Sequence, residues 1–377
     1  VLCLDDFHLA DEQSLSLLET FLEELREALK AGEISIILTS RSRPNFARIY
    51  DFEPLGGLSL ADTRKLVAAG QIHLSDDQIS QLHLTTAGNA QFLTLAQQAL
   101  QKTADPARMI SRLAESENLE DYLLHEVDQN LSAGQRQVMS AVAVLLGYPG
   151  TRDAIEALLE GESVLRSLKE LSDQQLLTTA EGKTGREYGQ HAILRAFYYD
   201  LLSTQQRQAM HHRAGQYYAA QEKDLLKAGL HFERAGEKVQ AASVATSDIR
   251  SIINQGQARV FLRLIERFSQ GEIGADLWAR VCFTRGQLYA LLGEGQLARE
   301  SYAQALQQTH QMPPSPEQEA IEAGIHLGMG EMLQLEDPQQ ARDWLQRGLV
   351  KLKDGNPLKA ALQIKLGYID IHLGNYA

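Results

Sequence analysis

Residues 1–10 read VLCLDDFHLA, in which four apolar or small residues, Val1 to Leu4, run into two acids, Asp5 and Asp6. This pattern predicts a buried strand whose carboxylates emerge at its carboxyl end, where α/β sheets bind their ligands. One carboxylate there can hold a metal ion or its water shell, and a second can orient an attacking water. The alternative is an ordinary buried strand with two solvated aspartates in its exit loop. The ten residues alone favour that alternative.

The next forty residues predict a second strand beside the first. Residues 14–29 (SLSLLETFLEELREAL) carry apolar side chains at helical spacing. Ile34 to Leu38 (ISIIL) is a short apolar run that predicts a strand buried on both faces of a parallel sheet. It is followed by Thr39, Ser40 and Arg41. Strand, helix and strand form a βαβ unit with polar residues after both strands.

This order of elements resembles the STAND class of signalling ATPases, which includes NB-ARC proteins and bacterial regulators of the MalT type. The resemblance implies that residues 1–4 form the Walker B strand of a P-loop domain, with Asp5 on Mg²⁺ and Asp6 acting on the catalytic water. It implies that Arg41, in the Thr-Ser-Arg triplet, binds the phosphates of ATP or ADP. An arginine fork suits a phosphate, although pairing with Asp5, Asp6 or a surface acid is the alternative.

The glycine-rich phosphate loop of such ATPases is missing from the sequence. No G-x-x-x-x-G-K-[ST] occurs in the 377 residues, and the family places this loop several dozen residues before the Walker B strand. The first residue already lies in the predicted strand and the last in a helical pattern. We therefore expect an internal segment of a longer protein, which by itself binds nucleotide weakly or not at all.

A small helical lid is expected after residue 57. Ser59 is a predicted N-cap, with Asp62 three residues later. Residues 86–90 (TAGNA) resemble the family's G-x-P element, which implies nucleotide contacts for Gly88 and Asn89. Ala90 replaces the proline that packs against adenine in the family. From the backbone, Gly88 and Asn89 are expected to end one helix and begin the next.

A winged-helix pattern is expected in the middle of the chain. Two helices are predicted between residues 117 and 146, with Ser132 as the N-cap of the second. The remaining predicted elements are helices 151–159 and 163–171 and strands 176–180 and 186–191, joined by a turn at 181–185. Three helices before a hairpin are typical of a winged helix.

His191 opens the segment His-Ala-Ile-Leu-Arg, which resembles the H-x-L-[LIV]-R signature at the end of the family's winged helix. The resemblance implies that this imidazole touches the phosphate of bound ADP in the closed, resting state. Imidazole can do so as a donor or as a cation. The alternatives are a histidine that caps a helix and one that satisfies a hydrogen bond in the core.

Two other features of the middle region are expected to have no ligand. The predicted recognition helix offers only Arg166 and Lys169 beside acids, which is thin for a DNA phosphate footprint. His211 and His212 are adjacent and point to different faces of a helix. A solvated helix is therefore favoured over a metal site.

The carboxyl-terminal third predicts helical repeats. Gly286, Tyr289, Ala298, Tyr302 and Ala305 match the tetratricopeptide spacing of small and aromatic residues. A weaker copy contains Ala341, Leu345 and Gly348, and a third is expected to begin at Gly367 and to be cut before its second helix. Stacked repeats form a superhelix whose concave face binds a peptide, a protein or a small effector. The alternative is an array that only supports the ATPase domain.

The composition disfavours nucleic-acid and membrane partners for this chain. The net charge of −13 does not favour a nucleic-acid surface, and Cys3 and Cys282 are the only cysteines, which fits a reducing, cytoplasmic compartment. No apolar run approaches the ~20 residues of a membrane helix. We expect no direct nucleic-acid binding and no membrane partner for this segment.

The sequence thus predicts a mainly α fold in four parts. These are the C-terminal part of a P-loop NTPase domain (1–57), a helical lid (58–115), a winged helix (116–215) and a TPR-like α-solenoid (216–377). The expected function is an ATP/ADP-dependent switch, with an effector on the repeats, self-association on activation and slow hydrolysis. A transcription factor with its DNA-binding domain outside this segment is compatible with that function. The alternative is a helical-repeat adaptor with a relic NTPase domain.

Overall fold

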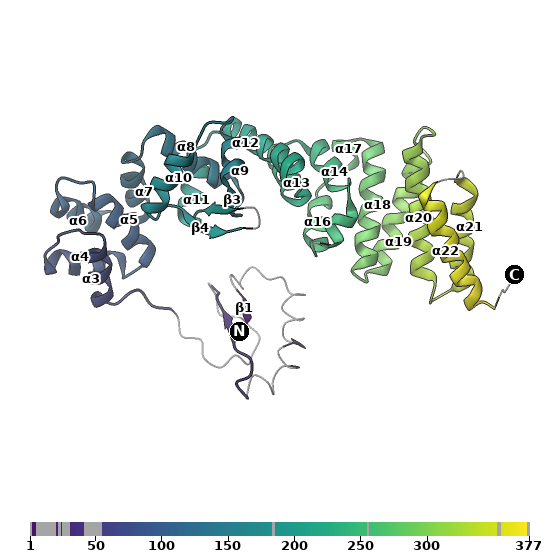
Figure 1. The fold of residues 1–377 in the computed structure, drawn as a ribbon, viewed down its shortest axis with the longest axis horizontal. Coiled ribbons are helices and arrows are strands. Elements are labelled where there is room, and N and C mark those ends of the chain that lie inside the picture. The colour runs from purple at the N-terminus through teal and green to yellow at the C-terminus, as the bar shows by residue number, and fades with distance from the viewer. Residues whose placement is uncertain are drawn as a thin grey trace. The chain divides into compact units, whose positions relative to one another are not determined.

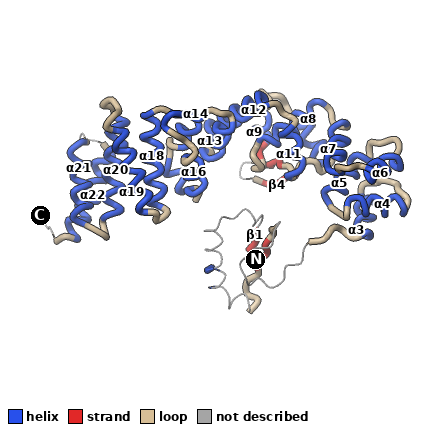
Figure 2. Tube along the Cα trace, turned by 180° about the vertical axis from the view of Figure 1, so that it is seen from behind, coloured by secondary structure: helices blue, strands red, loops and turns tan. Residues whose placement is uncertain are grey.

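The structure is a computed structural model that describes residues 2–4, 20–21, 24, 31–40, 55–182, 185–254, 256–352 and 356–374. It divides into two units, Val1–Leu93 with Asp105–Glu115, and Thr94–Ala104 with Ser116–Ala377. Helices dominate the described residues, and those of the second unit's carboxyl-terminal part stack as antiparallel neighbours (Figures 1 and 2). The predicted mainly α fold with a TPR-like solenoid is confirmed.

The first strands pair as the sequence predicts. β1 (Leu2–Leu4) lies parallel to β2 (Ile36–Leu38), with Leu2 opposite Ile36 and Leu4 opposite Leu38. The predicted burial on both faces is wrong for these strands, because Leu2 is 37% exposed and Ile37 56% exposed. Two strands alone cannot cover their own faces.

Four helices follow, and each begins at a residue suited to it. They are α3 (Leu60–Ala69), α4 (Asp76–Thr86), α5 (Ala90–Leu100) and α6 (Pro106–Glu115). The predicted cap is confirmed, because the Ser59 hydroxyl accepts a hydrogen bond from the Asp62 backbone N–H at 3.2 Å. Ser75 and Gln78 form a reciprocal capping box at α4. Buried Leu82 and Ile110 belong to the apolar core of these helices.

The middle region combines helices with a small antiparallel sheet. Its helices are α7 (Leu119–Gln129), α8 (Ala133–Val144), α9 (Arg152–Leu158), α10 (Leu165–Asp173), α11 (Ala192–Asp200) and α12 (Thr204–Tyr217), continued by the π-helix Tyr218–Glu222. The sheet has the order β3 (Gly150–Thr151), β5 (Arg186–Gly189), β4 (Thr178–Glu181). The hairpin predicted at 176–191 is therefore present, with shorter strands. Ser132 caps α8 through a capping box with Gln135, as predicted.

Ten helices of the second unit's described part make up the repeats. They are α13 (Leu225–Arg234), α14 (Lys238–Ala245), α15 (Ile249–Asn254), α16 (Ala258–Ile265), α17 (Gln270–Ile273), α18 (Ala275–Leu291), α19 (Gly295–Thr309), α20 (Pro316–Leu333), α21 (Pro338–Lys351) and α22 (Pro357–His372). In Figure 1, α18 to α22 lie side by side. Their buried apolar residues form two core clusters, one from α13 to α18 and one from α18 to α22.

The tetratricopeptide spacing has a visible packing cause. A Cβ on Gly286 would lie 2.5 Å from the Tyr302 ring, so glycine lets α18 and α19 approach closely. Ala298 and Ala305 flank this contact and are fully buried. In the next pair, Gly330 meets Leu345 in the same way. The predicted small and aromatic positions are therefore the helix contacts.

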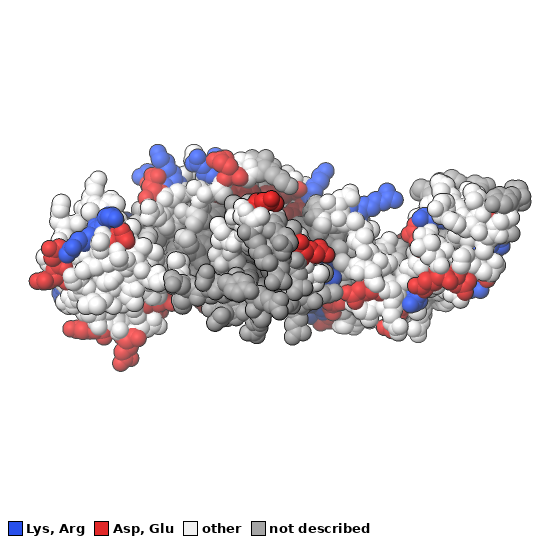
Figure 3. Space-filling model, turned by 90° about the horizontal axis from the view of Figure 1, so that it is seen from below, with Lys and Arg blue, Asp and Glu red and all other residues white. Residues whose placement is uncertain are grey.

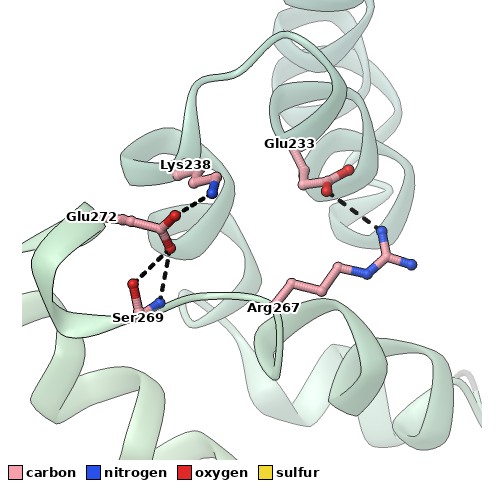
Figure 4. Close-up of polar contacts among 5 residues, drawn as sticks. All are labelled: Glu233, Lys238, Arg267, Ser269 and Glu272. Carbon is pink, nitrogen blue, oxygen red and sulfur yellow. Dashed lines mark hydrogen bonds and ion pairs between the residues drawn. The ribbon is translucent and has the colours of Figure 1, made fainter.

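Polar links join the first repeat helices to the α16–α17 segment (Figure 4). Arg267 Nη1 lies 3.5 Å from Glu233 Oε1, and Lys238 pairs with Glu272. Glu272 also accepts hydrogen bonds from the Ser269 backbone N–H at 3.1 Å and hydroxyl at 2.8 Å. Partly exposed ion pairs are worth ~0.2–1 kcal/mol, so these links set helix register more than they stabilise the fold.

Candidate functional site

The parallel strands bring two predicted nucleotide elements to one edge. The Thr39 backbone N–H donates to the Leu4 carbonyl at 2.9 Å, so β1 and β2 end side by side. Asp5 follows β1 in the sequence and Arg41 follows β2. Asp5, Asp6 and Arg41 themselves lie outside the described residues, so their predicted roles stay predictions. In α/β proteins, ligands bind at the carboxyl ends of the parallel strands.

Gly88 and Asn89 have local backbone roles. Gly88 has φ +67° and its carbonyl accepts a hydrogen bond from the Leu58 N–H at 2.7 Å. Asn89 Oδ1 accepts from the N–H groups of Gln91 and Phe92 at 2.9 and 3.2 Å, which caps α5. The two residues end one helix and begin the next, as predicted. Their nucleotide contacts stay predictions.

His191 occupies the N-cap position of α11, but its side chain makes no capping hydrogen bond. The imidazole is exposed, so it does not satisfy a core hydrogen bond either. Its neighbour Gln190 is tied to α8, because Gln190 Nε2 donates to the Met139 carbonyl at 2.9 Å. Neither structural alternative accounts for His191, and its side chain is accessible to a ligand.

Arg195 lies one turn after His191 and closes the same signature. Its guanidinium lies against Gly147, whose φ is +86°, since a Cβ on Gly147 would meet Nη1 and Cζ of Arg195. Residues four apart on a helix share a face, so His191 and Arg195 offer two nitrogen-bearing side chains near the start of α11. A helix N-terminus with such side chains favours an anion.

A cavity of about 640 Å³ lies elsewhere in the second unit, between α7, α8, the α9–α10 turn, α11 and α12. Asp128, Arg136 and Tyr198 are among the residues that line it, and no predicted site residue does. Arg136 Nε lies 3.3 Å from Asp128 Oδ1. Burial and the Asp128 charge raise the pKa of Tyr198, which keeps its hydroxyl protonated. Sequence reasoning missed this cavity because its lining residues come from separate helices.

The expectation of a solvated helix at His211 is wrong. His211 is fully buried, and its Nδ1 lies 2.9 Å from Nδ1 of His231 on α13. Its Nε2 lies 3.1 Å from the Tyr199 hydroxyl. Burial lowers the pKa of His211 to about 4 and that of His231 to about 3, so both rings are neutral near pH 7. Among the described residues, no group of three or more His, Cys, Asp and Glu side chains could hold a metal ion.

The predicted recognition helix, which has few cations for DNA phosphates, carries an ion pair between two of its own side chains. Arg166 Nε lies 2.8 Å from Glu170 Oε1 on α10, so this cation is already partnered. On the face of the molecule that Figure 3 shows, basic and acidic side chains are interspersed. No helix among the described residues is long and apolar enough to cross a membrane.

Comparisons with known proteins identify the fold. No protein-family model matches the sequence, and no curated protein matches it. A crystal structure of a Signal Transduction ATPase with Numerous Domains (STAND) protein with a tetratricopeptide repeat sensor, from Pyrococcus horikoshii, is similar, with a TM-score of 0.57 and 14% identity. The similarity covers 98% of this chain and 63% of that chain. This chain therefore has the fold of the corresponding part of that protein.

Proposed function

We propose that this chain is part of a STAND-type signalling ATPase that switches between ADP and ATP states, resembling regulators of the MalT type. The observation that carries the proposal is the fold likeness to a STAND protein with a repeat sensor, which runs over 98% of the chain. The order of motifs along the sequence agrees with it. The repeats would receive the signal, and self-association with transcriptional output would follow.

The strand edge is compatible with a nucleotide and Mg²⁺. β1 and β2 are parallel and end together, and two carboxylates and an arginine follow them in the sequence. Asp5 would hold Mg²⁺, Asp6 would orient water and Arg41 would bind phosphate oxygens. The metal would neutralise charge on the phosphates. The 377 residues contain no phosphate loop, so the cradle for the phosphates is not among them.

His191 would link the repeat-bearing part of the chain to the nucleotide. Its exposed imidazole at the start of α11 can donate a hydrogen bond to an ADP phosphate oxygen. Such a contact holds the resting state only if it is stronger there than in the ATP state. Effector binding on the repeats would break this contact and allow exchange.

The experiment is nucleotide binding by the natural protein that carries these residues. We expect Asp5→Ala to weaken Mg-ATP affinity at least tenfold and to abolish turnover, while Asp11→Ala, a nearby acid with no predicted role, retains both. Equal Mg-ATP affinity and turnover in wild type and Asp5→Ala would exclude the proposed magnesium role. A natural protein that binds neither ATP nor ADP would instead be a helical-repeat adaptor with a relic NTPase domain.

A further inference from the structure

Two buried histidines connect the first repeat helix to α11, the helix whose N-cap is His191. His211 lies on α12 and His231 on α13, and both side chains are fully buried. Their Nδ1 atoms are 2.9 Å apart. On the other edge of its ring, His211 Nε2 lies 3.1 Å from the hydroxyl of Tyr199, which belongs to α11. Three consecutive helices are therefore joined by polar contacts between buried or half-buried side chains.

The proton positions on the two rings couple His231 to Tyr199, although His211 lies between them. A neutral imidazole has one N–H donor and one nitrogen acceptor. If His211 Nδ1 donates to His231, then His211 Nε2 accepts from the Tyr199 hydroxyl. If His231 Nδ1 donates instead, His211 Nε2 carries the proton and donates to Tyr199. His231 therefore determines which hydrogen bond Tyr199 makes.

The carboxyl-terminal end of α11 is held by residues of α12. Arg207 lies over the Tyr199 ring, 4.4 Å from its centre, and pairs with Asp200 at 3.2 Å. The Asp200 side chain is 76% exposed, so water weakens this ion pair. The contact with His211 is shielded from water, because His211 is buried. The hydrogen bond between His211 and Tyr199 is therefore the strongest candidate for fixing this end of the helix.

The other end of α11 presents His191, whose own side chain makes no capping hydrogen bond. Beside it, Gln190 Nε2 donates to the Met139 carbonyl at 2.9 Å, which pins the chain at the start of the helix. The nine residues of α11 span ~14 Å, and so short a helix moves as a rigid rod. Freedom at the Tyr199 end becomes a tilt about Gln190, which changes the direction of the His191 imidazole.

We propose that His231 is a positioning residue for His191, acting through His211 and Tyr199 to orient α11. This inference rests on the proposed function, in which the His191 imidazole binds an ADP phosphate. It adds a route for the signal, because a movement of α13 within the repeats separates His231 from His211. His211 then has a buried nitrogen without a partner, which is costly, so the contact favours the resting arrangement.

The first measurement is hydrogen exchange, followed by mass spectrometry, on the nucleotide-free natural protein. His231→Phe keeps a ring against Tyr218 but cannot hydrogen bond to His211, and it should speed exchange of the α11 amides roughly fivefold or more. His231→Asn should restore slow exchange, because its amide places a polar atom near the former position of Nδ1. Tyr199→Phe removes only a hydroxyl, should match His231→Phe, and serves if that variant fails to fold.

The second measurement is the rate of ADP release from the same variants. We expect His231→Phe to release ADP roughly threefold to tenfold faster than wild type, since it weakens the phosphate contact without removing it. The double variant His191→Ala/His231→Phe should be no faster than His191→Ala alone, whereas independent effects would multiply. His326→Phe is the matched control, because His326 is another buried histidine of the repeats and lies on α20. It should release ADP at the wild-type rate.

The outcomes separate this inference from the proposed function. If His191→Ala releases ADP faster but His231→Phe and Tyr199→Phe do not, His231 has no positioning role. Unchanged exchange of the α11 amides, or a double variant whose rate is the product of the two single effects, would overturn it as well. Equal loss of protection in His231→Phe and His326→Phe would show a stabilising role only. A wild-type release rate in His191→Ala would instead remove the proposed role of His191, and the positioning role with it.

Discussion

The buried histidine pair predicts that the second unit is sensitive to mild acid. His211 and His231 are 0% and 1% exposed and joined at 2.9 Å, and His231 Nε2 has no hydrogen-bond partner among the described residues. The ring of Tyr218 stacks on His231, and the Tyr199 hydroxyl meets His211. The cations Arg207, Arg234 and Lys227 oppose protonation of the pair. Protonation thus puts positive charge in a buried, already cationic environment.

The sign of the effect follows from the two pKa values. Burial lowers the pKa of His211 to about 4 and that of His231 to about 3 in the folded chain. Unfolded histidine has a pKa of about 6.5, so the unfolded chain binds more protons below that pH. Stability is complete above about pH 6.5 and is lost as pH falls toward the folded pKa values. From pH 7 to pH 5 the loss is about 2 kcal/mol for each histidine.

The assay is urea unfolding followed by tryptophan fluorescence between pH 5 and pH 7.5. The two tryptophans of the chain, Trp278 and Trp344, both lie in the repeats of the second unit. His231→Phe keeps a ring beside Tyr218 and removes one titrating group. The slope of the unfolding free energy with pH should therefore fall by about 1.2 kcal/mol per pH unit between pH 5 and 6. Equal slopes in wild type and His231→Phe would refute the reasoning.

Three other substitutions test a helix contact, a helix cap and a buried ion pair. Tyr302→Ala removes a 2% exposed ring from the α18–α19 contact and should cost about 3–5 kcal/mol in urea unfolding, whereas a cost below 1 kcal/mol would contradict that packing. Ser132→Ala removes the α8 capping box and should cost about 1 kcal/mol, and an unchanged thermal midpoint would show that the cap contributes nothing. Lys351→Met leaves Glu322, which is 4% exposed and 2.8 Å from the Lys351 ammonium, with less compensation. Lys351→Met should lower the free energy of unfolding by about 3 kcal/mol, and Lys351→Arg should restore most of the loss.

Local rules predicted much of the helical part of the fold. Ser59 and Ser132 cap helices as expected, because a cap depends on a hydroxyl and the next three residues. The repeat contacts at Gly286 and Tyr302 were predictable because a close helix crossing demands a small residue opposite a large one. Each of these patterns lies within a short stretch of the sequence.

Features made by distant residues were not predictable in this way. His211 was expected in solvent, because its helix alone does not show that α13 brings His231 against it. The cavity near Asp128 and Tyr198 is lined by helices that lie more than sixty residues apart in the sequence, so no local sequence pattern predicts it. Burial of β1 and β2 depends on segments beyond the two strands, which the apolar runs do not specify.

The candidate site was predicted from motif order more than from single residues. His191 is an exposed residue at the start of α11, and neither a cap nor a core hydrogen bond accounts for it. Gly88 and Asn89 are accounted for by backbone geometry alone. Of the predicted nucleotide residues that the structure describes, His191 is therefore the strongest candidate.

The measurement that tests the switch most directly is the rate of ADP release from the natural protein, followed by displacement of a fluorescent ADP analogue. A hydrogen bond to a charged phosphate is worth about 1.5–3 kcal/mol, so His191→Ala should release ADP roughly tenfold to a hundredfold faster. His73→Ala, a substitution of another exposed histidine, should release ADP at the wild-type rate. An unchanged ADP release rate in His191→Ala, or no ADP binding by the natural protein, would contradict the account.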